Sequence, residues 1–245
     1  MTKSPEVALD EQLIASTEFQ KTAMASKLNW LRAGILGAND GIMSTSGILM
    51  GVAGATTNAN TIFFTGVAAV VAGSISMAGG EYTSVSAQRD SEIAALEIER
   101  KELAEQPELE LRELTWFYEQ KGLDYDLAHM VAKQLTEKDA LKAHAEAELG
   151  IELGEHVNPL AAALSSFVAF AAGGILPLVA VTGPWVAWRI PATIFAVLVS
   201  LILTGFVGAK IGGAKAFRPI LRNVLISVAT MAITYGIGRL VGTSV

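Results

Sequence analysis

The sequence predicts an all-α membrane protein, with five transmembrane helices and a cytoplasmic three-helix acidic domain inserted between the second and the third. Hydrophobic residues make up 51% of the 245 residues, and the mean hydropathy is +0.44, which is too apolar for an ordinary soluble domain. Residues 41–80 and 157–188 contain no Asp, Glu, Lys or Arg. Residues 88–156, in contrast, contain 18 acidic and 8 basic residues, so this block carries a charge of −10 against −6 for the whole chain.

Five apolar stretches are long enough to cross a bilayer, which takes about 20 helical residues. We place these spans at residues 32–56, 61–86, 160–182, 190–210 and 220–241. Lys and Arg gather before the first span and between the fourth and the fifth, and such segments face the cytoplasm under the positive-inside rule. The domains are therefore a cytoplasmic N-terminal tail (1–31), the first two spans (32–87), the cytoplasmic domain (88–157) and the last three spans (158–245).

The acidic block is expected to form three helices. The first continues out of the second span without a helix breaker, from Ser86 to Gln106, and stops at Pro107. The second covers about 108–121 and ends at Gly122, a common helix-terminating residue. The third runs from about 124 to 153, with a kink near Thr136.

Two pairs of glutamates flank the predicted turn at Pro107. Glu99 and Glu102 are three residues apart, as are Glu110 and Glu113, and this spacing places each pair on one helical face. If the two helices fold back on each other, the four carboxylates converge. Carboxylates this concentrated repel one another unless cations lie among them, so we expect a metal site. For any single pair, a simple Glu-rich exposed helix stays an alternative.

The third acidic helix offers further ligands. His144, Glu148 and Glu152 follow one another at intervals of four residues, which aligns them in a row along one face. Cysteine is absent, so any ligand must be oxygen, imidazole or thioether. These ligands suit Fe(II) or Mn(II) better than Cu(I). We expect the metal as a transported and regulatory ion and no prosthetic group.

Two acidic residues lie within the apolar part of the chain. Asp40 is the fourth residue of the GANDG sequence at 37–41, and Glu81 follows Met77 by one helical turn. A carboxylate at the bilayer centre costs about 2.5 to 3.5 kcal/mol and therefore usually faces a bundle interior or a water-filled path. Packing of Met77 in the core and an interfacial position for Glu81 are the simpler alternatives, but the three residues together favour an ion path.

Glycines are frequent in the first two spans. Gly37 with Gly41 and Gly47 with Gly51 have the spacing that lets helix backbones approach closely. This pattern predicts a tight bundle or a dimer seam, without indicating a cargo.

Three segments resemble the vacuolar iron transporter family, also called the cross-complements-calcium family. They are Gly37 to Gly41 (GANDG), Ser76 to Arg89 (SMAGGEYTSVSAQR) with Asp90 after it, and Lys138 to Gly150 (KDALKAHAEAELG). The resemblance covers residues 28–242 and implies a homodimer of five-span subunits, each with a cytoplasmic metal-binding domain. It also implies export of Fe(II), often Mn(II), from the cytosol in exchange for protons.

The family's functional positions can be carried over residue by residue. The resemblance implies an ion site in the membrane on Asp40 and Met77 with Glu81 nearby. It implies a cytoplasmic site on Glu99, Glu102, Glu110 and Glu113, completed by Glu148 and Glu152 from the third helix. The family has a Met near Glu148, whereas Glu146 and Ala147 stand there here; His144 is a candidate replacement, and the choice between Fe(II) and Mn(II) stays open.

We therefore expect a transporter of divalent metal and no enzyme. A membrane-anchored metal sensor or buffer is the alternative, and it would need neither Asp40 nor Met77. A membrane iron oxidase fits less well, because the Glu-x-x-His pairs of di-iron bundles are missing. An acidic pI of about 5.2 without a basic stripe argues against nucleic acid as a partner. The expected location is a prokaryotic inner membrane, with the N-terminus and the acidic domain in the cytoplasm.

Overall fold

The computed structural model describes residues 5–151, 153, 158–213 and 215–242, with side chains from residue 30 onward. The described chain is helical almost throughout, as predicted. Its elements are α1 (Pro5–Ala55), α2 (Ala59–Glu105), α3 (Pro107–Gln120), α4 (Tyr125–His144), the π-helical turn η1 (Ala145–Leu149), α5 (Pro159–Thr182), the 3-10 turn η2 (Val186–Trp188), α6 (Arg189–Ile211) and α7 (Phe217–Gly242).

The chain divides into two compact units. We call Lys27–Thr83 with Pro159–Val245 the membrane unit, and Met1–Ser26 with Ser84–Asn158 the acidic unit. The membrane unit holds the second half of α1, the first half of α2 and all of α5, α6 and α7. The acidic unit holds the first half of α1 and the rest of α2, together with α3, α4 and η1.

Four helical stretches are long and apolar enough to cross a membrane. They are Ala59–Glu105, Pro159–Thr182, Val186–Ile211 and Phe217–Gly242. They contain the predicted second to fifth spans. The predicted first span, 32–56, lies in α1 except for its last residue. It is not among these four stretches, because Asn39, Asp40 and several Gly and Ser residues lower its hydropathy. The chain is an all-α membrane protein, and a membrane-spanning role for α1, which would bring the number of spans to five, stays a prediction.

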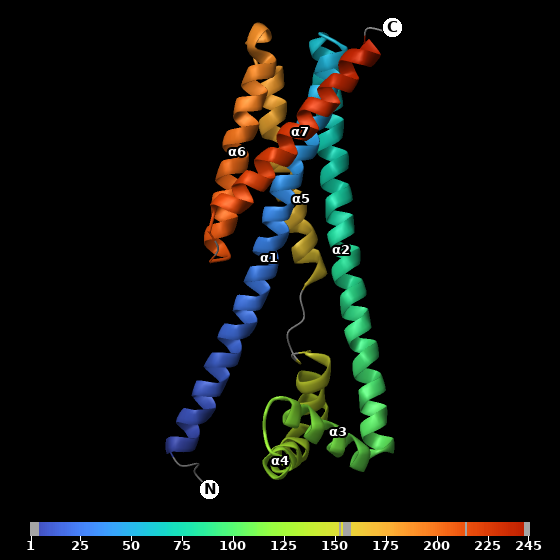
Figure 1. Cartoon of the computed structure of the whole chain (residues 1–245), viewed down its shortest axis with the longest axis vertical. Coiled ribbons are helices and arrows are strands. Elements are labelled where there is room, and N and C mark those ends of the chain that lie inside the picture. The colour runs from blue at the N-terminus through green and yellow to red at the C-terminus, as the bar shows by residue number, and fades with distance from the viewer. Residues whose placement is uncertain (1–4, 152, 154–157, 214, 243–245) are drawn as a thin grey trace. The chain divides into compact units, whose positions relative to one another are not determined.

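Glycines of α1 lie in close contact with α5 and α7, two other helices of the membrane unit; Figure 1 labels the three helices. A Cβ added to Gly37 would lie 2.7 Å from the carbonyl oxygen of Ser166 in α5, and one added to Gly47 would lie 2.9 Å from a methyl group of Thr230 in α7. Such distances leave no room for a side chain. The predicted small-residue pattern thus packs helices within one chain, and Ser166 strengthens the contact by donating its hydroxyl to the Ala33 carbonyl at 3.2 Å.

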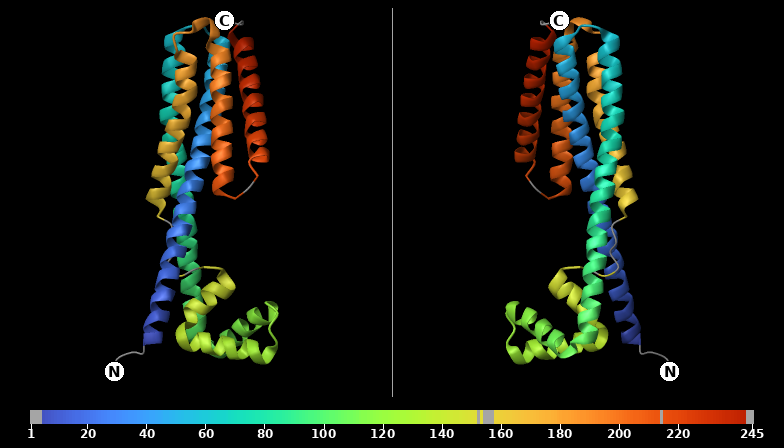
Figure 2. Two further views of the ribbon diagram at one scale, coloured as in Figure 1. Left: turned by 90° about the vertical axis from the view of Figure 1, so that its left-hand side faces the viewer. Right: turned by 90° about the vertical axis from the view of Figure 1, so that its right-hand side faces the viewer.

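The helices of the membrane unit are connected in alternation. The α1–α2 and α5–α6 connections and the end of α7 lie at one end of this unit, and the α6–α7 connection lies at the other (Figure 2). Two apolar clusters fill the space between the helices. The first joins α1, α6 and α7 through Ile42, Met50, Val197, Leu201 and Met231. The second joins α1, α2 and α5 through Leu49, Ile62, Val70, Leu178 and Val181.

In the acidic unit, the helix boundaries follow local sequence signals. α2 ends at Glu105, and Pro107 is the first residue of α3, where the missing N–H of proline is tolerated. Gly122 ends this segment with a φ of 99°, which only glycine adopts readily. α4 then begins at Tyr125, and the carboxylate of Asp124 caps it by accepting the Leu127 N–H at 3.0 Å.

Two details of the third acidic helix differ from the prediction. The kink lies at Asp139, with φ −164° and ψ 94°, three residues beyond Thr136. Here the Asp139 carboxylate accepts the Lys142 N–H at 3.0 Å and caps the helix as it restarts. The helix also ends earlier than 153, because η1 stops at Leu149 and Gly150 takes a left-handed φ of 64°.

Candidate metal sites

The acidic unit contains a buried cluster of carboxylates around one histidine. The Nδ1 atom of His144 lies 3.0 Å from Oε1 of Glu99, 3.7 Å from Oε2 of Glu110 and 3.7 Å from Oε2 of Glu148. The side chains of Glu99 and Glu110 are 3% and 6% exposed, that of His144 is fully buried, and that of Glu148 is 27% exposed. We call these four residues the acidic cluster. Its members come from α2, α3, α4 and η1, so three chain segments must fold together to form it.

The π-helical turn aims Glu148 at the cluster. In η1 the N–H groups of Gly150 and Ile151 both bond to the carbonyl of Ala145, which widens the last turn of the segment. Turns of this kind are rare and frequently occur at functional sites. The same turn buries Ala145 and leaves Glu148 as the partly exposed side of an otherwise enclosed cluster.

Burial and mutual repulsion make the cluster reluctant to hold several negative charges. Desolvation, followed by the charges of Glu148 and Glu110, raises the pKa of Glu99 from 4.5 to about 7. Desolvation is also the first cause of the raised pKa of Glu110 and Glu148, and repulsion between the carboxylates is the second. Burial lowers the pKa of His144, so its imidazole is neutral at neutral pH. Neutral imidazole is the form that binds metals.

The cluster has polar atoms that a metal ion would satisfy. Oε1 of Glu99 and both ring nitrogens of His144 are buried, and none makes a well-aligned hydrogen bond to any residue within the described ranges. Such orphaned groups are costly inside a protein. One ligand atom each from Glu99, His144 and Glu148 lies within 4.8 Å of the others. Oxygen and imidazole donors in this arrangement fit Fe(II) or Mn(II).

The other predicted ligands of the acidic unit lie at the margin of the acidic cluster. Glu102 is exposed and Glu113 is half-buried, but both are near enough for their charges to raise the pKa of Glu99. The expected row of His144, Glu148 and Glu152 does not form as one helical face, because helical structure ends at Leu149. Glu152 itself lies outside the described residues.

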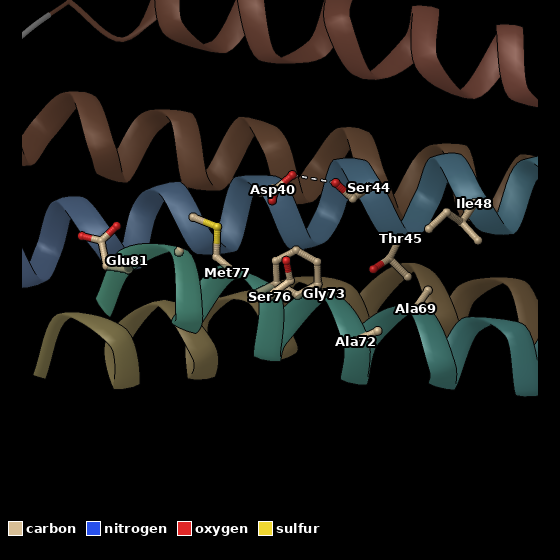
Figure 3. Close-up of a pocket in the computed structure, with 12 residues that line it drawn as sticks. Asp40, Ser44, Thr45, Ile48, Ala69, Ala72, Gly73, Ser76, Met77 and Glu81 are labelled. Atoms are coloured by element: carbon tan, nitrogen blue, oxygen red, sulfur yellow. Dashed lines mark hydrogen bonds between the residues drawn. The ribbon is translucent and has the colours of Figure 1, made fainter. Parts of the chain in front are cut away.

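The second site is a pocket in the membrane unit, between α1 and α2, with a volume of about 530 Å³. Asp40 on α1 and Met77 and Glu81 on α2 all line it. Figure 3 shows the thioether of Met77 reaching from α2 toward α1, where Asp40 lies. The three residues that the sequence predicts for the ion path therefore line one pocket, from two different helices.

Hydroxyl groups in this pocket were not predicted from the sequence. The Ser44 hydroxyl donates to Oδ1 of Asp40 at 2.6 Å (Figure 3), which fixes the direction of the carboxylate. Oγ1 of Thr45 is buried and has no hydrogen-bond partner among the residues described here. Ser44 and Thr45 follow Asp40 by four and five residues, so helical spacing from the intramembrane acid was the signal that could have identified them.

Glu81 marks one end of the pocket. Its side chain is 10% exposed and forms an ion pair with Arg32 of α1, with 3.6 Å between Oε1 and Nη2. The Arg32 side chain is 66% exposed, so solvent and headgroups screen the pair and its contribution to stability is small. A cation entering between α1 and α2 at this end would meet Glu81 first.

The chain is similar to known proteins along most of its length. A family model described as the VIT family matches residues 31–239. A vacuolar iron transporter of Acanthamoeba castellanii is 42% identical over 214 residues, covering 86% of this chain and 78% of that protein. Vacuolar iron transporter homolog 5 of Oryza sativa subsp. japonica is 33% identical over 219 residues, covering 89% and 83%. Vacuolar iron transporter homolog 2 of Arabidopsis thaliana is 31% identical, also over 219 residues, covering 89% and 87%.

Proposed function

The chain belongs to the VIT family, and from this premise we propose that it transports Fe(II), Mn(II) or both across a membrane, out of the cytosol. The names of its relatives support iron as a cargo. The observation that carries the proposal is the pocket between α1 and α2, which offers a carboxylate, a thioether and hydroxyl groups inside an otherwise apolar unit. A bundle without an ion to bind would gain nothing from a carboxylate at the position of Asp40.

The proposed topology has five spans, with α1 as the first. Support for α1 as a span comes from the close packing of Gly37 and Gly41 against α5 and of Gly47 and Gly51 against α7, because a helix held this tightly belongs to the same bundle. The N-terminus and the acidic unit then lie in the cytosol, and two chains form a homodimer. The relatives are eukaryotic and named for the vacuole, so they lend no support to the prokaryotic inner membrane expected from the sequence.

In the proposed mechanism, the acidic cluster captures the metal first. Glu99, Glu110, His144 and Glu148 bind the ion and raise its concentration near the membrane. In the pocket, Asp40 and Met77 then replace part of the hydration shell of the ion, and Ser44 and Thr45 supply further oxygen atoms. A thioether is a soft ligand, and it favours transition metals over Mg(II) or Ca(II).

Proton exchange follows from the same carboxylates. A carboxylate binds metal only when deprotonated, so a proton and a metal ion compete for each site. With a pKa of about 7, Glu99 changes protonation within the physiological range. If Asp40 also alternates between the two ions, an outward metal flux and an inward proton flux become coupled.

The test is metal flux into proteoliposomes under an imposed pH gradient. We expect Asp40→Asn to abolish flux while leaving metal binding by the acidic cluster intact. Asp126→Asn is the matched control, because Asp126 is an exposed carboxylate of α4 and its loss should leave flux unchanged. Full Fe(II) and Mn(II) flux in the Asp40→Asn protein would refute the proposed role of the pocket.

A metal sensor or buffer anchored in the membrane is the second candidate. The orphaned atoms of His144 and Glu99 favour it, because a closed binding site needs no pathway. This candidate predicts that the wild-type protein binds metal and produces no flux in the same proteoliposomes. It also predicts that Asp40→Asn and wild type are indistinguishable, so one experiment separates the two functions.

A further inference from the structure

A groove between α1, α6 and α7 lies outside both candidate metal sites. Its volume is about 600 Å³. Two arginines line it from different helices, Arg32 of α1 and Arg222 of α7, together with the amides of Asn39 and Asn223. The rest of its wall is mostly apolar and includes Leu31, Ile35, Leu36, Gly205, Gly208 and Ile211.

A second, apolar depression of about 280 Å³ adjoins this groove along α1 and α6. The two share Leu31, Ile35, Thr204 and Ile211 as common wall. The depression adds the indole of Trp30, which is 51% exposed. The Thr204 hydroxyl is already occupied, since it donates to Oδ1 of Asn39 at 2.6 Å. The surface therefore has a cationic part and a hydrocarbon part in direct continuity.

We propose that this surface binds an anionic phospholipid, with its phosphate between Arg32 and Arg222 and an acyl chain along the depression beside Trp30. Only a lipid has an anionic group and a long hydrocarbon chain in one molecule, as the two parts of this surface require. Basic pockets between transmembrane helices bind anionic headgroups, and arginine holds phosphate oxygens through two parallel hydrogen bonds. Tryptophan is also a typical residue of the membrane interface.

The charges around the groove favour an anionic over a zwitterionic headgroup. Arg32 is shared with Glu81 at 3.6 Å, whereas Arg222 forms no ion pair with a residue that the structure describes. Lys215 lies in the connection that leads into α7 and Arg218 lies in the first turn of α7, and neither lines the groove. A zwitterionic lipid would bring its own cation to this surface and gain less.

The experiment measures lipid preference directly and needs no transport. The full-length protein is reconstituted in phosphatidylcholine, and brominated phosphatidylglycerol or brominated phosphatidylcholine is titrated in. Quenching of Trp30 is obtained as the difference between each protein and its Trp30→Phe counterpart. We expect brominated phosphatidylglycerol to quench Trp30 at a lower fraction than brominated phosphatidylcholine.

The decisive variants are Arg222→Gln and its neighbour Arg218→Gln. We expect Arg222→Gln to reduce the preference for phosphatidylglycerol about fivefold, since a basic residue near an anionic lipid surface contributes about 1 kcal/mol. Arg218 is exposed and does not line the groove, so Arg218→Gln should keep the preference. If Arg222→Gln fails to fold, Arg222→Lys serves instead and should retain most of the preference, because it retains the charge.

Three results would overturn the proposal. They are equal quenching by both lipids in the wild type, an equal loss in the two glutamine variants, and displacement of phosphatidylglycerol by millimolar inorganic phosphate. The second would indicate diffuse surface charge. The third would indicate a site for a free anion.

Discussion

Metal binding by the acidic cluster should strengthen steeply as the pH rises. The pKa of Glu99 is raised to about 7, above its usual 4.5, so at lower pH a proton occupies the oxygen that the metal needs. For one such carboxyl, the apparent affinity increases about tenfold between about pH 6 and about pH 8. The raised pKa of Glu110 and Glu148 adds to this increase. Burial lowers the pKa of His144, so its ring loses its proton at a lower pH than an ordinary histidine and contributes less to this increase.

The assay is the free Mn(II) signal in electron paramagnetic resonance, recorded with the full-length protein in detergent across this pH range. Glu99→Gln should bind Mn(II) more weakly, and its affinity should lose the part of the pH dependence that comes from one titrating proton. Glu97→Gln is the matched control, because Glu97 is an exposed carboxylate two residues away on the same helix, and it should follow the wild type. An affinity that is flat with pH in the wild type, or an unchanged slope in Glu99→Gln, would refute the electrostatic description of the cluster.

Two further predictions concern packing and capping. Gly41→Ala should destabilise the protein by about 1 to 3 kcal/mol and lower its melting temperature, because the added Cβ would overlap the Phe170 carbonyl. Gly79→Ala is the control and should be harmless, because no atom lies within 4 Å of the added Cβ. Equal melting temperatures for the two variants would contradict this packing. Asp139→Ala should destabilise the acidic unit by about 1 kcal/mol through loss of the cap on the Lys142 N–H. The measurement is the stability of each variant by calorimetry, with Asp139→Asn as the comparison because its side-chain oxygen can keep the cap. An Asp139→Ala protein as stable as Asp139→Asn would show that the cap contributes nothing.

The helices of the acidic unit could be predicted where strong local signals mark their ends. Pro107 and Gly122 each act through their own backbone chemistry, so the ends of α2 and α3 follow from the sequence. The kink at Asp139 could not be found in this way, because an aspartate inside a helical pattern caps a new helix only when the chain around it bends. Ala143 and Ala147, which flank the start of the π-helical turn at 145–149, belong to one apolar cluster with Leu114 of α3, and no local pattern reveals this tertiary contact.

The sequence predicts which residues are candidate ligands, but it does not predict which of them are buried in the site. Spacing alone treated Glu99 and Glu102 as equals, yet the fold buries Glu99 and leaves Glu102 exposed. The difference depends on which side of α2 meets α3 and η1, and that is a tertiary property. In the membrane unit, Asp40 and Met77 could be chosen because a charged or thioether group is conspicuous in an apolar span. Ser44 was overlooked because serine is common in such helices.

The wide turn at η1 makes the length of the chain, and not only its composition, a determinant of the acidic cluster. Deleting one residue between Ala145 and Glu148 would place that carboxylate three residues after His144 in place of four and would remove the extra residue that makes the turn wide. The geometry between the carboxylate and the ring would then change although every ligand was still encoded. Insertions and deletions in this segment should consequently be tolerated far less than exchanges among its small side chains.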